Sequence, residues 1–331
     1  MIGLLKHNYT IPLSSIFDAK NIVWVALKNA FEQVGCHLLT EDVIGSQQPD
    51  FELHLDVHAR SYNVPLFVVL NENSLVYPPN GNLNWLRRQY RWCFSWDPQL
   101  AHLGIATKIQ LPHSLGEGVV DGYKNRPQLV VMIASNKRLA QWWSPQNLYP
   151  ERIRAIRWFE EHAPADFELY GHLWTFSSKF PKQLSFITHP LEKVIPRWLY
   201  WQPSSWRGVI PTKREVLEKA RFSIVYENVK GLQGYITEKI FDAFCAGNVP
   251  IYWGAEDVTD YIPAECMIDR RQFKSYNELY EFIRGMPEET YIDYQRAICH
   301  FLASEAAQAF SVELFAQTVV QEILKRLPAA Q

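Results

Sequence analysis

The sequence has 331 residues, of which 47% are hydrophobic and 21% are charged, and its formal net charge at pH 7 is −2. This length is sufficient for two domains, and the composition is that of an ordinary globular protein. The near-neutral charge argues against a nucleic-acid partner, which would require a basic surface.

Cysteine usage and the lack of long apolar runs indicate the compartment. Five cysteines are scattered along the chain without a CxxC pair: Cys36, Cys93, Cys245, Cys266 and Cys299. We therefore expect reduced thiols in a reducing compartment and no zinc site. No run approaches the roughly 20 apolar residues of a spanning helix, and the first residues, MIGLLKHNYTIPL, do not have the pattern of a signal peptide. We expect a cytoplasmic protein that starts at its own Met and was not trimmed from a membrane-anchored form, with peripheral membrane contact left open.

The first part of the chain, residues 1–126, is predicted to be an α/β domain. Ile22–Val34 has the apolar spacing of an amphipathic helix. The sequence FELHLDV, Phe51–Val57, alternates apolar and polar residues, which predicts a strand with one solvated face. His54 and His58 lack a third ligand at a suitable spacing, so we assign them to this solvated face and not to a metal site.

A carboxylate follows the apolar strand PLFVVL, Pro65–Leu70, almost directly. The sequence continues with Asn71, Glu72 and Asn73 and then enters a loop rich in Pro, Asn and Gly. Enzymes with parallel sheets place catalytic groups just past the carboxyl ends of strands. Glu72 is therefore a candidate catalytic carboxylate, and the alternative is an ordinary residue of a surface loop.

The second part of the chain, residues 127–300, is predicted to be another α/β domain, joined to the first by the Gly- and Pro-rich segment Pro112–Pro127. The apolar strand Leu129–Ala134 opens this domain. The helix Tyr149–His162 follows and carries three arginines. The segment 173–209, rich in Trp and Pro, is predicted to be irregular.

The stretch Arg221–Asp257 carries the clearest functional signal. It is predicted to form a strand, a loop with two glycines, a helix over Tyr235–Ala246 and a second strand. One face of this helix is apolar. The other face is polar and carries Tyr235, Glu238, Lys239 and Asp242.

Lys239 is an unusual residue for the first turn of a helix, because the helix dipole disfavours a cation there. The unpaired N–H groups of a helix N-terminus suit an anion. An anionic ligand would resolve the conflict. The alternative is an ordinary βαβ crossover with a solvated polar face.

The sequence YENVKGLQGYITEK, followed by AGNVPIYWGAEDV, resembles the donor-binding signature of the α1,3-fucosyltransferases, family 10 of the glycosyltransferases. The family pattern is an aromatic-Glu-Asn triplet, a Gly-containing loop, Tyr-Val-Thr-Glu-Lys, and a Val-Pro strand that leads to a Gly. Here Ile236 replaces the Val, and Tyr226 stands where Phe is usual. The sequence LNENSLVYPPN also resembles the segment that holds the general base of the family, with Glu72 at the matching position.

The resemblance implies an α/β fold of the GT-B type, in which two Rossmann-like domains face a cleft. Residues 1–126 would form the acceptor-side domain, and residues 127–300 would bind the nucleotide sugar. Residues 301–331 would form a helix that packs back on the first domain.

The resemblance also implies a reaction, the inverting transfer of fucose from GDP-fucose to a hydroxyl of a glycan acceptor that contains N-acetylglucosamine or glucose, in an α1,3-type linkage. It assigns proton abstraction to Glu72 and binding of the pyrophosphate to Lys239 and one arginine of the helix. Arg152 matches the apolar spacing of the family helix, whereas Arg154 fits the distance to the next strand better, so both stay candidates. The other donor contacts fall to Asn228, Tyr235 and Glu238.

No DxD pair follows a strand in a metal-binding context, so we predict no obligatory metal and no cofactor besides the donor substrate. Two other functions remain open. One is a transferase of the same fold that uses a different nucleotide sugar, and the other is an inactive protein that binds nucleotides or glycans. The acceptor and the oligomeric state do not follow from the sequence.

Overall fold

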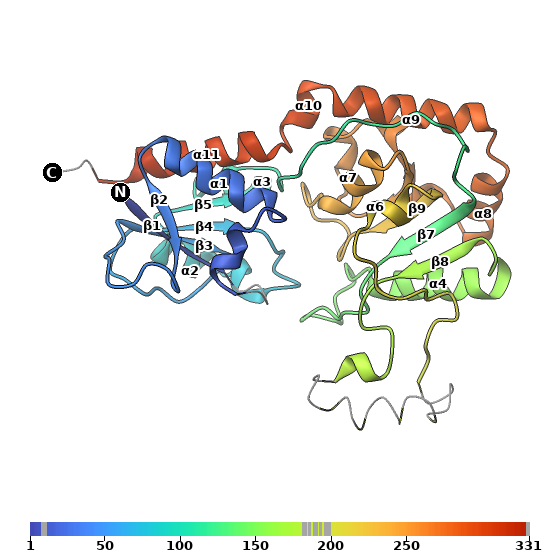
Figure 1. Cartoon of the computed structure of the whole chain (residues 1–331), viewed down its shortest axis with the longest axis horizontal. Helices are drawn as coiled ribbons and strands as arrows, with labels where there is room; N and C mark the ends of the chain where they lie inside the picture. Colours follow the sequence, from blue (N-terminus) through green and yellow to red (C-terminus); the bar gives the residue numbers. More distant parts are fainter. Residues whose placement is uncertain are drawn as a thin grey trace.

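The structure is a computed structural model that describes residues 1–7, 12–180 and 200–328, together with positions 184, 187, 191 and 194. The chain forms two α/β domains, each built around a parallel sheet, which lie side by side in Figure 1. Part of the segment 173–209, for which the sequence predicts irregular structure, lies outside the described residues.

The N-terminal domain contains a six-stranded parallel sheet with the order β2-β1-β3-β4-β5-β6. Its strands are β1 (Ile2–Lys6), β2 (His37–Thr40), β3 (Phe51–Leu55), β4 (Leu66–Leu70), β5 (Trp92–Ser95) and β6 (Ala106–Lys108). Its helices are α1 (Ile22–Gln33), α2 (Leu83–Gln89) and α3 (Pro98–His102).

This domain has two hydrophobic cores, and successive residues of β4 pack alternately into one and the other. Phe67 and Val69 pack in the core that contains residues of α1, whereas Val68 and Leu70 pack in the core beneath α2 and α3. A strand that is covered on both faces must be apolar at every position. This is why PLFVVL has no alternation.

The structure corrects the prediction for β3. Its five residues are all buried, including Glu52 and His54, which are both 0% exposed. His54 Nε2 lies 2.8 Å from Glu52 Oε2, and its Nδ1 lies 2.8 Å from the hydroxyl of Tyr90. The polar residues in the alternating pattern therefore pair with each other inside the domain, and the expected solvated face for His54 is wrong.

The C-terminal domain contains a five-stranded parallel sheet with the order β11-β10-β9-β7-β8. Its strands are β7 (Gln128–Ile133), β8 (Phe167–Tyr170), β9 (Ala220–Tyr226), β10 (Val249–Trp253) and β11 (Ile268–Asp269). Its helices are α4 (Tyr149–His162), α6 (Arg214–Leu217), α7 (Glu238–Cys245), α8 (Tyr276–Arg284), α9 (Glu288–Leu302) and α10 (Glu305–Gln308).

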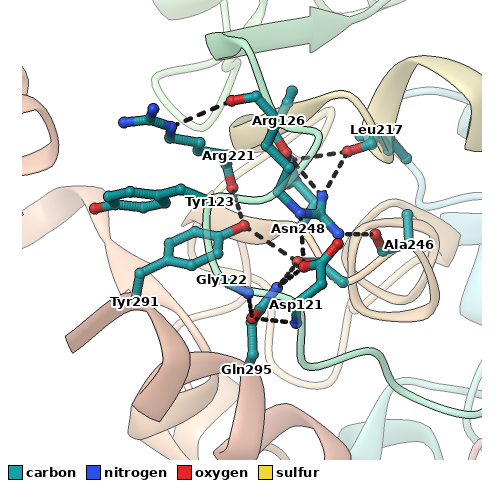
Figure 2. Close-up of polar contacts among 12 residues, drawn as sticks. Asp121, Gly122, Tyr123, Arg126, Leu217, Arg221, Ala246, Asn248, Tyr291 and Gln295 are labelled. Atoms are coloured by element: carbon teal, nitrogen blue, oxygen red, sulfur yellow. Dashed lines mark hydrogen bonds and ion pairs between the residues drawn. The ribbon is translucent and has the colours of Figure 1, made fainter. Parts of the chain in front are cut away.

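The linker between the domains is anchored to the C-terminal domain by a buried polar network (Figure 2). The guanidinium of Arg126 is almost fully buried and donates to the carboxylate of Asp121 at 2.9 Å. Its other N–H groups donate to three backbone carbonyls, those of Leu217, Ala220 and Ala246. The sequence predicts this boundary at residue 126, and the network shows that the linker already belongs to the C-terminal domain before that residue.

The last helix, α11 (Val312–Arg326), returns to the N-terminal domain, where both described ends of the chain lie (Figure 1). Phe315, Val319 and Ile323 of this helix are part of the same core as α1. Phe315 also makes an edge-to-face contact with Trp24 of α1. The expected fold of two Rossmann-like domains with a returning C-terminal helix is confirmed.

Candidate active site

A cleft of about 530 Å³ lies between the domains, at the carboxyl ends of strands from both sheets. The N-terminal domain contributes Glu72, just past β4, and the C-terminal domain contributes residues just past β7, β8 and β9. The lining includes six of the seven candidate residues, Glu72, Arg152, Asn228, Tyr235, Glu238 and Lys239. Arg154 is not among the lining residues.

Lys239 is held by a carboxylate at the end of β9. Its ammonium donates to Glu227 Oε2 at 2.9 Å and to the hydroxyl of Thr237 at 2.6 Å. Burial acts to lower the pKa of Lys239, but the carboxylates of Glu227 and Glu238 outweigh this effect and raise it above its usual value. Lys239 therefore stays charged, and Glu227 already balances much of that charge within the chain.

The helix that carries Lys239 is shorter than the sequence predicts. It begins at Glu238, after an extended Thr237 and a loop in which Gly234 has a φ of +72°. Tyr235 precedes the helix and is buried, with its ring centroid 4.8 Å from that of Trp96 in the N-terminal domain. The predicted start at Tyr235 is wrong, because this side chain is fixed by packing between the domains.

The N-terminus of α7 has backbone N–H groups that its N-cap residue, Thr237, does not cap. The side chain of Thr237 makes no capping hydrogen bond to the helix, since its hydroxyl interacts with Glu227 and Lys239 instead. The first N–H groups of a helix without such a cap are available to an anion.

Arg152 lies in the second turn of α4 and is 6% exposed. Its guanidinium donates to the carbonyl oxygen of Tyr226 at 2.6 Å and to Asn228 Oδ1 at 3.1 Å, and it stacks on the ring of Tyr149. Within the described part of the chain, no carboxylate forms an ion pair with it. A buried cation without a counter-ion is energetically costly, so this position favours an anionic ligand.

Arg154 lies on the opposite side of α4. Its side chain is 68% exposed and forms an ion pair with Glu151 on the same helix. The sequence left the choice between these two arginines open. In the structure, Arg152 reaches the cleft and Arg154 does not.

Glu238 lies at the rim of the cleft, 3.5 Å from the ammonium of Lys213. Desolvation acts to raise the pKa of Glu238, but the nearby ammonium groups of Lys239 and Lys213 hold it well below its usual value. Lys213 also pairs with Asp242 at 2.6 Å. Glu238 is therefore an ionised acceptor for hydroxyl groups.

Glu72 lies on the other wall of the cleft, in the N-terminal domain. Its Oε2 is buried and has no hydrogen-bond partner among the described residues. Burial, together with the negative charge of Asp56, raises the pKa of Glu72 above its usual value, against the opposing effect of Lys239. A half-buried carboxylate with a raised pKa is a suitable proton acceptor.

Sequence reasoning missed two parts of this site. Glu227 is not among the candidate residues from the sequence, although it holds both Thr237 and Lys239. Its place in the aromatic-Glu-Asn triplet was the available signal. His113 also lines the cleft, and no local sequence pattern marks it.

Comparison with known proteins finds a match for the segment that carries Asn228, Tyr235 and Lys239. Residues 189–311 match the model of the glycosyltransferase family 10 (fucosyltransferase) C-terminal domain. This segment is similar in sequence to the family 10 glycosyltransferases. The expected family is confirmed, and the match includes Asn228, Tyr235 and Lys239.

Curated relatives of this family 10 domain align over short segments. A 75-residue segment is 33% identical to the α-(1,3)-fucosyltransferase FucT of Helicobacter pylori, and it covers 23% of this chain and 16% of that protein. A 69-residue segment is 36% identical to an α-(1,4)-fucosyltransferase of Arabidopsis thaliana, covering 21% of this chain and 17% of that protein. The chain thus aligns with less than a fifth of the length of these two relatives.

Solved structures resemble the chain over its whole length. An α1,3-fucosyltransferase with GDP-fucose has a TM-score of 0.53 at 13% identity, and the match covers all of this chain and 91% of the other. Anabaena HepE with UDP-glucose has a TM-score of 0.52 at 12% identity, with 98% and 99% covered. These similarities confirm the GT-B type of fold.

Two further properties concern the described residues only. None of their helices is long and apolar enough to cross a bilayer. They contain no cluster of three or more His, Cys, Asp or Glu side chains arranged to hold a metal ion.

Proposed function

We propose that this protein is an inverting glycosyltransferase that transfers fucose from GDP-fucose to a hydroxyl of a glycan acceptor containing N-acetylglucosamine or glucose, in an α1,3-type linkage. The observation that carries the proposal is the buried guanidinium of Arg152, which lacks a carboxylate partner among the described residues. Arg152 lines the same cleft as Lys239, which belongs to the segment that matches family 10, and Glu72 lies on the other wall.

The donor would bind on the C-terminal wall of the cleft. Arg152, Lys239 and the first N–H groups of α7 would receive the diphosphate, because they supply positive charge that does not need to reorganise. Glu238 would accept hydrogen bonds from the ribose hydroxyls. Asn228 and Tyr235 would contact the phosphate, the ribose or the sugar.

Glu72 would act as the general base. The acceptor hydroxyl oxygen forms a bond to the anomeric carbon of fucose while the bond from that carbon to the diphosphate oxygen breaks. The electron pair of the broken bond leaves with GDP, and the hydroxyl proton passes to Glu72. Because the acceptor and the diphosphate occupy opposite walls, attack occurs from the face opposite the leaving group, which inverts the configuration.

A second candidate is a transferase with another nucleotide sugar. Solved structures with UDP-glucose resemble the chain as closely as the fucosyltransferase with GDP-fucose does, with TM-scores of 0.52 and 0.53. The residues assigned to the diphosphate and the ribose do not distinguish donors, since these groups are common to them. The family 10 match favours fucose.

Turnover assays test these candidates. GDP-fucose and UDP-glucose are each incubated with N-acetyllactosamine and related acceptors, and the products are analysed for linkage. We expect fucosylated product from GDP-fucose only. Product from UDP-glucose alone would establish the second candidate.

The variant Glu72→Gln separates an enzyme from a protein that only binds its ligands. We expect turnover to fall by about 10²- to 10⁴-fold, the usual contribution of a general base, while GDP affinity stays within about twofold. Near-normal turnover in this variant would exclude Glu72 as the base.

We also propose that turnover needs no metal ion, since Arg152, Lys239 and the helix N-terminus would supply the positive charge. Activity is measured after exhaustive chelation. Complete loss of turnover that a divalent ion restores would contradict the proposal.

A further inference from the structure

A second carboxylate lies directly behind Glu72. Asp56 follows β3, which pairs in parallel with β4, so the carboxyl ends of the two strands bring Asp56 next to the Glu72 segment. Asp56 is 9% exposed, and its φ is +63°. Asp tolerates this left-handed conformation better than most residues, but a non-glycine residue held there at a cleft marks a constrained position.

The carboxylate of Asp56 holds the backbone that leads into Glu72. Its Oδ1 accepts hydrogen bonds from the N–H groups of Asn71 at 2.8 Å and of Glu72 at 3.0 Å. The backbone N–H of Asp56 itself donates to the carbonyl of Val69 at 2.8 Å. The end of β4 is thereby fixed to the end of β3 beyond the regular sheet.

Asn80 holds the same segment from the opposite side. Its Nδ2 donates to the carbonyl oxygen of Glu72 at 2.8 Å and to Asp56 Oδ1 at 2.6 Å. Its Oδ1 accepts from the N–H of Val57 at 3.0 Å. Asn80 is 6% exposed, so these bonds form with little competition from water.

We propose that Asp56 and Asn80 are positioning residues that hold the backbone of Glu72 from both sides and so keep its carboxylate in the cleft. This inference rests on the proposed role of Glu72. Nothing in the local sequence indicates it, because Asp56 follows β3, whereas Glu72 and Asn80 lie in the connection between β4 and α2.

Asp56 also acts on Glu72 through its charge. The charged groups that face the Glu72 carboxylate are Asp56 and Glu238, which raise its pKa, and Lys239 and Lys137, which lower it. A base with a raised pKa accepts a proton more readily. Removal of the Asp56 charge should therefore lower the pKa of Glu72 and weaken it as a base.

Three variants separate position from charge. Asp56→Gly accepts the positive φ but removes the carboxylate, and Asn80→Ala removes the bond to the Glu72 carbonyl. We expect each to lower kcat by about 10- to 100-fold, as small displacements of catalytic groups do. Asp56→Asn keeps an oxygen acceptor and tolerates the positive φ, so we expect only a several-fold loss of kcat.

The pH profile identifies the effect of charge. Turnover is lost when Glu72 is protonated, so the acid limb of kcat/KM follows its pKa. In Asp56→Asn this limb should move to lower pH. An unchanged limb would overturn the role of the charge, and wild-type kcat in Asp56→Gly and Asn80→Ala would overturn the positioning role.

Asn82→Ala is the matched control. Asn82 belongs to the same loop but only caps α2, by accepting from the N–H of Trp85 at 3.0 Å. We expect kcat within twofold of the wild type. A loss as large as in Asn80→Ala would show that any change in this loop impairs turnover, which would also overturn the proposal. GDP affinity within twofold verifies that each variant is folded.

A readout without turnover distinguishes this inference from the proposed function. The carboxyl carbon of Glu72 is titrated by ¹³C NMR in the wild type and in Asp56→Asn, with Glu72→Gln used to assign the signal. A lower pKa in Asp56→Asn supports the inference even if no donor is turned over, in which case only the proposed function fails. The same pKa in both proteins contradicts the inference.

Discussion

The two cations of the cleft differ in their partners, although both face the proposed diphosphate. Lys239 is paired with Glu227, which is fully buried, whereas Arg152 has only neutral partners within the described residues. The sequence suggested that an anionic ligand is needed to explain a lysine at a helix start. The structure shows that Glu227 resolves that conflict inside the chain, and that Arg152 is the residue in need of an anion.

This difference predicts unequal losses of stability for two variants that both lose GDP affinity. Lys239→Met strands the buried carboxylate of Glu227, so the free energy of unfolding should fall by about 3 kcal/mol. Arg152→Met removes an unpaired buried charge together with two hydrogen bonds, so stability should change by no more than about 1 kcal/mol. Both should weaken GDP binding by about 10-fold or more. Urea unfolding and calorimetric titration with GDP measure the two quantities.

Two further variants make this comparison specific. Arg154→Met changes an exposed arginine of the same helix and should leave GDP affinity unaltered. The double variant Glu227→Gln with Lys239→Met should regain stability but not GDP affinity. Equal losses of stability in Arg152→Met and Lys239→Met would show that the two cations are not held as described.

His113 is buried at the point where the linker crosses the cleft. Its ring stacks on Phe241 at 4.6 Å, and its Nε2 has no partner among the described residues. Burial lowers the pKa of His113 to about 4, from 6.5 in an unfolded chain. Between these values the unfolded state binds the proton and the folded state does not, so stability is lost as the pH falls from about 6.5 towards 4.

The variant His113→Phe should reduce this dependence. Between pH 7.5 and pH 5 the wild type should lose about 2 kcal/mol through this residue, a loss that the variant should not show. Some dependence remains through His58, whose pKa burial also lowers to about 4. Urea unfolding at both pH values is the measurement, and His300→Gln, at an exposed position, should behave as the wild type. If the free energy of unfolding of His113→Phe fell as much between pH 7.5 and pH 5 as that of the wild type, the result would contradict the burial of His113 as a neutral ring.

At the scale of elements, buried polar contacts hold the linker to the C-terminal domain. Gln295 of α9 donates to Asp121 and to the carbonyl of Gly247, and its Oε1 accepts from the N–H groups of Asp121 and Gly122 (Figure 2). Arg126 completes the network from the other side. The network joins the linker to α9, and α9 continues through α10 into the returning helix.

Arg126→Met should therefore destabilise the C-terminal domain. The change removes the ion pair with Asp121 and the hydrogen bonds to three buried carbonyls, so we expect the free energy of unfolding to fall by about 3–5 kcal/mol. Chemical denaturation measures the loss. Arg296→Met, which breaks an exposed pair on the outer face of α9, should have no measurable effect. A similarly small effect in Arg126→Met would mean that the network does not anchor the linker.

At the scale of the whole molecule, the cleft depends on a close approach of the two domains. A Cβ on Gly234 would lie 2.6 Å from the carbonyl oxygen of Trp96, and Gly234 also has a φ of +72°. Tyr235, the next residue, packs at a tilt against the Trp96 ring. The loop before α7 therefore touches the N-terminal domain at a position where only glycine fits.

Gly234→Ala should separate the domains and reduce turnover by about 10-fold or more, because Glu72 and the proposed donor site would no longer be aligned. Small-angle X-ray scattering should show a larger radius of gyration. Gly104→Ala imposes a similar backbone penalty at a φ of +66° but has nothing within 4 Å of its Cβ among the described residues. It should keep the wild-type radius and kcat. A wild-type radius in Gly234→Ala would show that the domains do not rely on this contact.

The sequence predicted features that depend on local pattern. The apolar runs placed β4, β7 and β9 within a residue or two, and α4 was predicted at its observed bounds. The motif from Tyr226 onward identified the family and most donor-side candidates. These predictions succeeded because strand burial, helix periodicity and a contiguous motif are all written within short segments.

Only the tertiary structure decided how these residues act together. Strand order and register bring Asp56 to Glu72, and Glu227 to Lys239, although neither pairing has a local signal. The choice between Arg152 and Arg154 depends on which side of α4 faces β9. The alternation in β3 was misread for the same reason, since a polar residue that is paired in the interior and one that is solvated give the same pattern. Contacts between distant segments decide which side chains are buried and which are paired. These contacts, more than the residue types, therefore determine which charged groups of this cleft are available to bind a ligand.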